Sequence, residues 1–144
     1  MSREYPAFPI PGVAAVTINK EKILLVIRGK SPNLGKWGIP GGVVEVGETV
    51  EEAIVREVYE ETNIVVKPIK LLTVFDSIGR DSEGKVRIHY VLLEYLCDYV
   101  SGEVKAASDA PDAKWVAISE MDSINMMENT RKFVKQVIKQ EGFE

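Results

Sequence analysis

Short apolar runs separated by turn residues fill the first part of this chain. Residues 13–18 and 22–28 are rich in aliphatic and β-branched side chains, and Lys20-Glu21 lies between them. This pattern predicts two strands joined by a tight turn. Residues 29–40 are dense in Gly, Pro, Ser and Asn, so they are predicted to form a loop.

A second pair of apolar runs, longer than the first, lies in the middle of the chain. Residues 65–78 and 86–99 have strand character, and the sequence Asp-Ser-Glu-Gly at 81–84 separates them. This arrangement predicts a long antiparallel hairpin. A short apolar run at 114–118 predicts one further strand.

The segment 50–62 has the spacing of an amphipathic helix. Thr49 precedes the segment and lies three residues before Glu52, which is the capping-box arrangement of a helix start. Asn63 follows the segment, and asparagine tolerates the left-handed conformation in which helices often end. These signals predict a helix whose two ends are fixed locally.

Two more helices are expected near the C-terminus. Ser119 is placed to cap a short helix, and Asn129 or Thr130 is placed to open a final one. The apolar face of the final helix is formed by Phe133, Val134, Val137 and Ile138. The elements together favour an α+β fold in which helices flank a mixed sheet. A chain of 144 residues suits one such domain, spanning 1–144.

Two acidic residues stand in the middle of the apolar face of the helix at 50–62. That face is formed by Ala53, Ile54 and Val58. At about 3.6 residues per turn, Glu57 and Glu61 fall within the same face. A partly buried acid without a partner is unfavourable, so this pair requires a compensating positive charge.

Two interpretations of these acids remain open at this point. In the first, the last turn of the helix is solvated and Arg56 pairs with one of the acids, as is usual for runs of charge. In the second, the acids are oxygen ligands for Mg²⁺ or Mn²⁺, since the set lacks the His and Cys that zinc favours. The glycines at 41, 42 and 47 favour the second, because they allow tight turns and the close approach of a ligand.

Residues 42–64, GVVEVGETVEEAIVREVYEETNI, resemble the Nudix box. The positions that match the family pattern at its spacing are Gly42, Glu48, Arg56, Glu57, Val58, Glu60, Glu61 and Ile64. Asn63 replaces the final glycine of the pattern and suits the same left-handed position. The sequence GKWGIPGG before the box and the strand that begins at Ala113 are also similar to Nudix hydrolases. The resemblance implies the Nudix fold, an α/β/α sandwich, as in MutT-like and ADP-ribose pyrophosphatase-like proteins.

The resemblance also implies an activity, the hydrolysis of the pyrophosphate linkage of a nucleoside diphosphate derivative with bound Mg²⁺ or Mn²⁺. The resemblance implies that Glu57, Glu60 and Glu61 are metal ligands or, for one of them, the general base. Glu48 and the carbonyl group of Gly41 or Gly42 are implied to complete the metal shell, and Gly41 and Gly42 to contact the substrate. Arg56 is then a partner that orients the carboxylates.

Five residues outside the box are further candidates. Asp109 lies in the loop where some Nudix enzymes place a metal-binding or base carboxylate, and its alternative role is that of a loop cap. Arg28 and Arg87 are candidates for contacting substrate phosphate or base, or else they are solvated strand residues. Phe75 or Tyr90 is a candidate for stacking on the base.

Two substrate classes remain open, nucleoside triphosphates, including oxidised ones, and ADP-ribose or dinucleotide-like molecules. Short ADP-ribose enzymes often carry a proline well past the box, and Pro68 comes too early for it, which favours a triphosphate or a generic diphosphate. The alternative from another class of protein is a catalytically silent, nucleotide-binding sensor. Such a sensor is expected to have lost one of the box acids, and Glu57, Glu60 and Glu61 are all intact.

Charge and composition limit the expected partners and location. The net charge of −4 provides no general attraction to a nucleic acid polymer. No apolar run approaches the ~20 residues of a membrane helix, and the N-terminus lacks the apolar core of a signal peptide. The single Cys97 cannot form an intrachain disulfide. We expect a cytoplasmic protein with a small-molecule nucleotide substrate and no membrane partner, either monomeric or a homodimer.

Overall fold

The computed structural model describes residues 3–29, 35–105 and 112–143. In chain order, the elements of these residues are β1 (Ile10–Asn19), β2 (Lys22–Ile27), β3 (Trp37–Gly38), β4 (Gly41–Val43), α1 (Val50–Thr62), β5 (Val65–Arg80), β6 (Val86–Ser101), β7 (Ala113–Ala117), the 3-10 helix η1 (Ile118–Ser123) and α2 (Glu128–Gln140). The mixture of strands and helices predicted from the apolar pattern is therefore confirmed.

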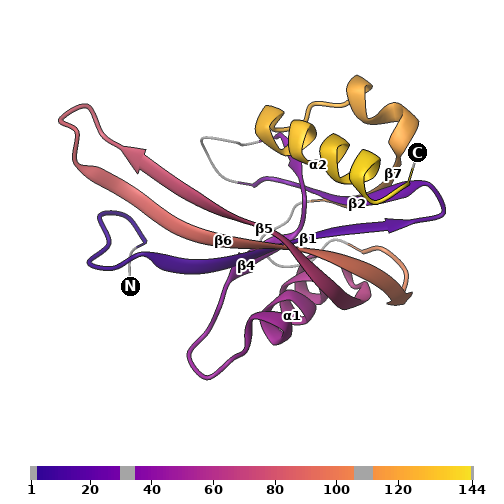
Figure 1. Ribbon diagram of the computed structural model, residues 1–144, viewed down its shortest axis with the longest axis horizontal. Coiled ribbons are helices and arrows are strands. Elements are labelled where there is room, and N and C mark those ends of the chain that lie inside the picture. The colour runs from indigo at the N-terminus through magenta and orange to yellow at the C-terminus, as the bar shows by residue number, and fades with distance from the viewer. Residues whose placement is uncertain (1–2, 30–34, 106–111, 144) are drawn as a thin grey trace.

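A mixed sheet forms the middle layer of the molecule (Figure 1). Its strands follow the order β3-β2-β1-β6-β5, while β4 also pairs with β1 and β7 with β2. β1 and β6 are parallel, with Val13 beside Leu93, and the other pairs are antiparallel. The predicted hairpin is confirmed, because β5 and β6 pair from Val65–Ser101 to Arg80–Val86.

Helix α1 covers one face of this sheet (Figure 1). It runs from Val50 to Thr62, with the capping box between Thr49 and Glu52, and Asn63 has a left-handed φ of 66°. Its start, its end and its cap all agree with the sequence prediction. The buried cluster on this side consists of Val13, Ala15, Leu24, Ala53, Ile54, Val58, Ile64, Val66 and Cys97.

Helix α2 and η1 cover the opposite face, which completes an α/β/α sandwich (Figure 1). Of the predicted apolar face of α2, Val134, Val137 and Ile138 are buried and Phe133 packs against them. The larger part of the core on this side comes from Val16, Ile18, Ile23, Leu25, Trp37, Ile39, Leu96, Val116, Met121 and Met126. Each central strand therefore contributes side chains to two separate cores.

The predicted start of the final helix is wrong by one or two residues. α2 begins at Glu128 with Met127 as its N-cap, before the expected Asn129 or Thr130. The cap makes no side-chain hydrogen bond. Instead, the main-chain N–H of Met127 donates to the carbonyl oxygen of Trp37 at 3.0 Å. A long-range contact, which the local sequence does not encode, fixes this helix end.

Two other local expectations are also wrong. Ser119 lies within η1 and does not cap it, since the capping position belongs to Ala117 and has no side-chain hydrogen bond. The predicted loop at 29–40 includes the two residues of β3, Trp37 and Gly38, which pair with β2. Burial of the Trp37 side chain in the core explains why this Gly-rich segment becomes a strand.

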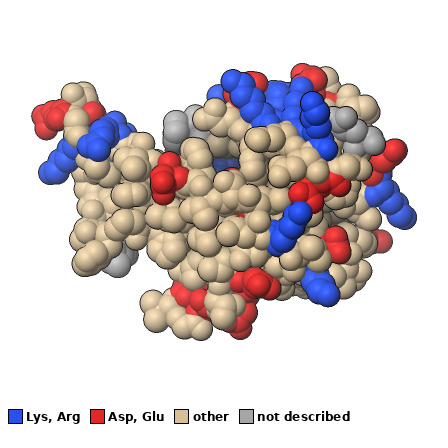
Figure 2. All heavy atoms as spheres, viewed as in Figure 1, with Lys and Arg blue, Asp and Glu red and all other residues tan. Residues whose placement is uncertain are grey.

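The far end of the β5–β6 hairpin extends beyond the body of the molecule, and the N-terminal segment folds against it (Figure 1). The hydroxyl group of Tyr5 donates to Asp81 at 2.9 Å, and Arg87 Nε pairs with Glu4 at 2.9 Å. Figure 2 shows that Lys and Arg gather over the α2 side of the molecule, while the flank of the hairpin is largely uncharged. None of the described helices is long and apolar enough to span a membrane.

Candidate active site

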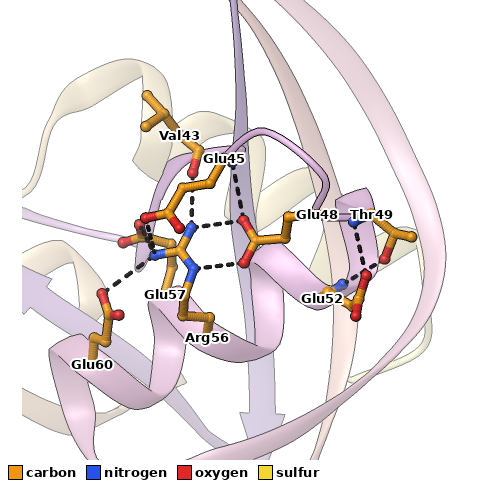
Figure 3. A network of polar contacts seen from close by, with 8 residues as sticks. All are labelled: Val43, Glu45, Glu48, Thr49, Glu52, Arg56, Glu57 and Glu60. Atoms are coloured by element: carbon orange, nitrogen blue, oxygen red, sulfur yellow. Dashed lines mark hydrogen bonds and ion pairs between the residues drawn. The ribbon is translucent and has the colours of Figure 1, made fainter. Parts of the chain in front are cut away.

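The start of α1 determines where its functional side chains lie. Thr49 Oγ1 accepts from the main-chain N–H of Glu52 at 3.1 Å, and Glu52 Oε1 accepts from the N–H of Thr49 at 2.9 Å. This reciprocal pair satisfies two N–H groups that have no partner within the helix. It fixes the rotational position of the helix, so that Arg56 and Glu57 face the loop that connects β4 to α1 (Figure 3).

Arg56 lies at the centre of a polar network (Figure 3). Its Nε donates to Glu48 Oε2 at 2.6 Å and its Nη2 to Glu48 Oε1 at 2.9 Å. This two-point pairing uses the planar guanidinium, and a lysine offers no equivalent geometry. Nη2 also donates to the carbonyl oxygen of Val43 at 3.0 Å. Arg56 therefore ties the helix both to the preceding loop and to the end of β4.

The remaining guanidinium nitrogen of Arg56 gathers further acids. Nη1 lies 2.7 Å from Glu57 Oε1, 3.3 Å from Glu60 Oε2 and 3.8 Å from Glu45 Oε1. The resemblance implied that Arg56 orients the carboxylates of the box, and the structure shows it paired with both Glu48 and Glu57. The positive charge required by an acid on the apolar face of α1 is thus provided by the neighbouring residue on the same helix.

The glycines of β4 allow the acids to approach the sheet. A Cβ atom on Gly42 would lie 2.3 Å from the carboxyl carbon of Glu57, closer than any real contact. The main-chain N–H of Gly41 donates to Glu61 Oε1 at 2.8 Å, and Glu61 is buried. A side chain at Gly42 is excluded by the carboxylate beside it, which explains the glycine at the start of the box.

The acids of the network differ in protonation behaviour because they differ in partners. Hydrogen bonds from Arg56 hold the pKa of Glu48 down to about 2. Burial raises the pKa of Glu57, although Arg56 opposes that rise. The hydrogen bonds to Glu48 in turn raise the pKa of Arg56 above its usual range. Glu48 is therefore firmly ionised, while Glu57 has the greater affinity for a proton.

The donor chemistry of the network suits a hard divalent cation. Every acid that surrounds Arg56 offers carboxylate oxygens, and Mg²⁺ and Mn²⁺ prefer oxygen ligands. Among the described residues, however, no three acidic, His or Cys side chains are already arranged as a metal cage. The guanidinium supplies the positive charge between the carboxylates. The residue types fit a metal, and rotation of exposed side chains such as Glu60, 47% exposed, would be needed to form the cage.

The structure does not bring the two candidate arginines into this network. Arg28 is exposed just after β2. Arg87 is on β6, six residues from Leu93, which is aligned with Val13 and thus with Gly42. At about 3.3 Å per residue, that separation is about 20 Å. Asp109 lies outside the described residues.

Sequence reasoning missed two features of the molecule. Glu45 and the carbonyl group of Val43 both contact Arg56. Their position just before Glu48 in the sequence could have indicated this contact. Glu94 is a partly buried acid on β6, far along the chain from the Nudix-like segment. Its signal was a lone charge within the otherwise apolar run 91–97.

The chain matches the NUDIX domain family over residues 9–137. It is 39% identical over 121 residues to an ADP-ribose pyrophosphatase from Methanocaldococcus jannaschii, a match that covers 83% of this chain and 67% of that protein. It is 34% identical over 122 residues to an NAD-capped RNA hydrolase NudC from Mannheimia succiniciproducens, covering 82% of this chain and 43% of that protein. The crystal structure of a MutT NUDIX hydrolase from Burkholderia pseudomallei has a TM-score of 0.74 and 33% sequence identity, covering 90% of this chain and 98% of that one.

Proposed function

The chain belongs to the NUDIX family and is an enzyme of the pyrophosphohydrolase class, and we propose that it hydrolyses ADP-ribose or a related nucleoside diphosphate derivative. The observation that carries the proposal is the ring of acids held by Arg56 beside the glycines of β4. The similar ADP-ribose pyrophosphatase from M. jannaschii supports this substrate class over a triphosphate. In this proposal residues 1–144 act as one domain, and the substrate is a small molecule.

In the proposed reaction, water attacks one phosphorus atom and the P–O–P bond breaks, so ADP-ribose yields AMP and ribose 5-phosphate. A bound Mg²⁺ or Mn²⁺ supplies charge neutralisation of the diphosphate and lowers the pKa of the attacking water. The residues that would hold it are Glu48, Glu57, Glu60, Glu61 and the carbonyl group of Gly41. The oxygen-only donor set described above supports this assignment.

The chain's own residues divide the remaining work. Arg56 holds Glu48 and Glu57 in fixed orientations through its planar fork. Oε1 of Glu57 already accepts from Arg56, so Oε2 is the oxygen left for the metal or for a proton from water. Glu48, with a pKa of about 2, is a poor proton acceptor. Glu57 is the better general base of the two, because its pKa is raised by burial.

A substrate panel tests the proposal. Purified protein is incubated with Mg²⁺ or Mn²⁺ and ADP-ribose, NAD, a nucleoside triphosphate or its oxidised form, and the products are identified. We expect AMP and ribose 5-phosphate from ADP-ribose, and no turnover in excess chelator. Glu51→Gln is the matched control variant, since Glu51 is an exposed acid on the same helix. Turnover of triphosphates alone would overturn the substrate assignment, and no turnover of any compound would favour the sensor alternative.

A further inference from the structure

A groove lies on the side of the sheet opposite to α1, between the β5–β6 hairpin and α2. Its volume is about 710 Å³, within the range of small-molecule sites. Its apolar walls include Phe75, Leu92 and Phe133, and its polar lining includes Thr130 and Gln136. Figure 2 shows the surface hollowed between the hairpin and the α2 side of the molecule. The Arg56 network does not contribute to it.

Glu94 lines this groove from β6. Leu96, two residues further along the strand, packs into the core beneath α2, so Glu94 faces the same side. No group among the described residues hydrogen bonds or ion pairs with its carboxyl group. Its oxygens also keep some contact with solvent, since Thr17 Oγ1 is the one fully buried side-chain polar atom without a partner in the described part of the chain. The groove therefore contains an acid available to a ligand.

The main chain at Glu94 lies only two strands away from the glycines beside the Arg56 network. Gly41, whose N–H binds Glu61, pairs with Ala14 on β1, and Ala14 pairs with Glu94 on β6. Neighbouring strands are about 4.8 Å apart, so the main chain at Glu94 lies about 10 Å from that at Gly41. A nucleotide whose phosphates contact the acids of α1 has to place its organic part within a similar distance.

From these observations we propose that the groove binds the nucleobase of the substrate, and that Glu94 selects a base with an acceptor nitrogen beside an amino group, as in adenine. This inference rests on the proposed function, because it assigns the organic end of the same substrate. The apolar walls, Phe75 among them, suit the face of a flat ring. Glu94 is then the polar group that recognises the edge of that ring.

The protonation of Glu94 is consistent with an adenine-like edge. Burial alone raises the pKa of this carboxyl group to about 7. A protonated carboxyl group presents one O–H donor and one acceptor oxygen, which complements an amino group next to a ring nitrogen. The other ionisable group in the lining is Asp76 of β5, while the lining residues of α2, among them Asn129 and Gln140, are uncharged. No cation from these walls holds Glu94 in its ionised form.

Direct binding tests the inference independently of catalysis. AMP, GMP and ribose 5-phosphate contain no pyrophosphate bond, so their dissociation constants are measured by calorimetry with Mg²⁺ present and without turnover. We expect AMP to bind more tightly than both other probes. Glu94→Leu should weaken AMP binding roughly tenfold or more and leave ribose 5-phosphate unchanged. Glu94→Gln, whose amide also offers a donor and an acceptor, should retain most of the affinity for AMP.

Two controls separate recognition from folding. Asp98→Asn removes an exposed charge from the same strand and should leave all three affinities unchanged. The melting temperature of Glu94→Leu should be no lower than that of the wild type, because the substitution removes a desolvated acid without a partner. Equal AMP affinity in the wild type and in Glu94→Leu would overturn the inference, as would AMP binding no tighter than ribose 5-phosphate. Intact AMP discrimination in a protein that hydrolyses nothing would overturn the proposed function alone.

Discussion

Acids on the two faces of one sheet behave in opposite ways. On the α1 side, Glu48 is held by two nitrogens of Arg56, and its pKa falls to about 2. On the α2 side, burial without a cation raises the pKa of Glu94 to about 7. Near pH 7 the same functional group is thus kept ionised in one place and about half protonated in the other. The partner of a carboxyl group, more than its residue type, therefore determines its protonation state.

The largest expected effect is a loss of kcat on substitution of Glu57, an acid of the Arg56 network. Glu57→Gln keeps the shape of the side chain and removes its charge and its proton affinity, so we expect kcat to fall roughly 10²- to 10³-fold. The fold should survive, because the amide oxygen still accepts from Arg56. Steady-state kinetics with ADP-ribose measures the loss, and Glu51→Gln is the control. Near-normal kcat in Glu57→Gln would show that the network does not perform the chemistry.

A smaller loss of kcat is expected when Arg56 is substituted. Arg56→Lys retains the charge and loses the two-point contact with Glu48, so kcat should fall about tenfold or more. Arg56→Ala should also lower the free energy of unfolding by about 1–2 kcal/mol, since the ion pairs are partly exposed. Arg80→Lys, on the hairpin, is the matched control for kinetics and urea unfolding. Unchanged kinetics in Arg56→Lys would show that the two-point contact with Glu48 has no role in catalysis.

Glu94, which has no cation beside it among the described residues, should make the free energy of unfolding depend on pH. Because the pKa of Glu94 is raised in the folded protein, this acid favours folding below its ordinary pKa of 4.5, and that contribution disappears as the pH rises through about 7. We therefore expect the free energy of unfolding, relative to Glu94→Gln, to decrease by about 1–2 kcal/mol between pH 4.5 and pH 8, after allowing for partial exposure. Urea unfolding at both pH values measures it. A constant difference would show that Glu94 has an ordinary pKa.

The smallest expected effect is a change in the stability contribution of Glu48 at acidic pH. The pKa of Glu48 is lowered in the folded protein, so its contribution to stability is present above its ordinary pKa of 4.5 and is lost as the pH falls towards 2. The difference in stability between the wild type and Glu48→Gln should therefore become smaller as the pH falls. Thermal unfolding between pH 6 and pH 3 tests this, and a difference that grows in acid would contradict the pairing with Arg56.

Local signals explain what the sequence predicted correctly. The ends of α1 follow from Thr49, Glu52 and Asn63, which act within one turn of the helix. The pairing of Arg56 follows from helical spacing, because an acid on an apolar face needs a nearby charge. The groove between the hairpin and α2 could not be predicted from local signals. Whether Glu94 is solvated or buried depends on the packing of α2, which lies far away in sequence and whose start is fixed by contact with Trp37.

The pairing of β1 along both edges affects how easily this strand opens and which side chains can change in evolution. This strand has β6 along one edge and β4 and β2 along the other, so its amide hydrogens exchange with solvent only when several neighbours separate together. Gly41 and Glu94 are both registered on Ala14 of this slowly opening strand. The spacing between the Arg56 network and the groove is therefore set by a strand that is paired along both edges. Side chains of β5 and α2 that only line the groove, such as Phe75 and Gln136, can therefore change over generations without disturbing the geometry of the acids on α1.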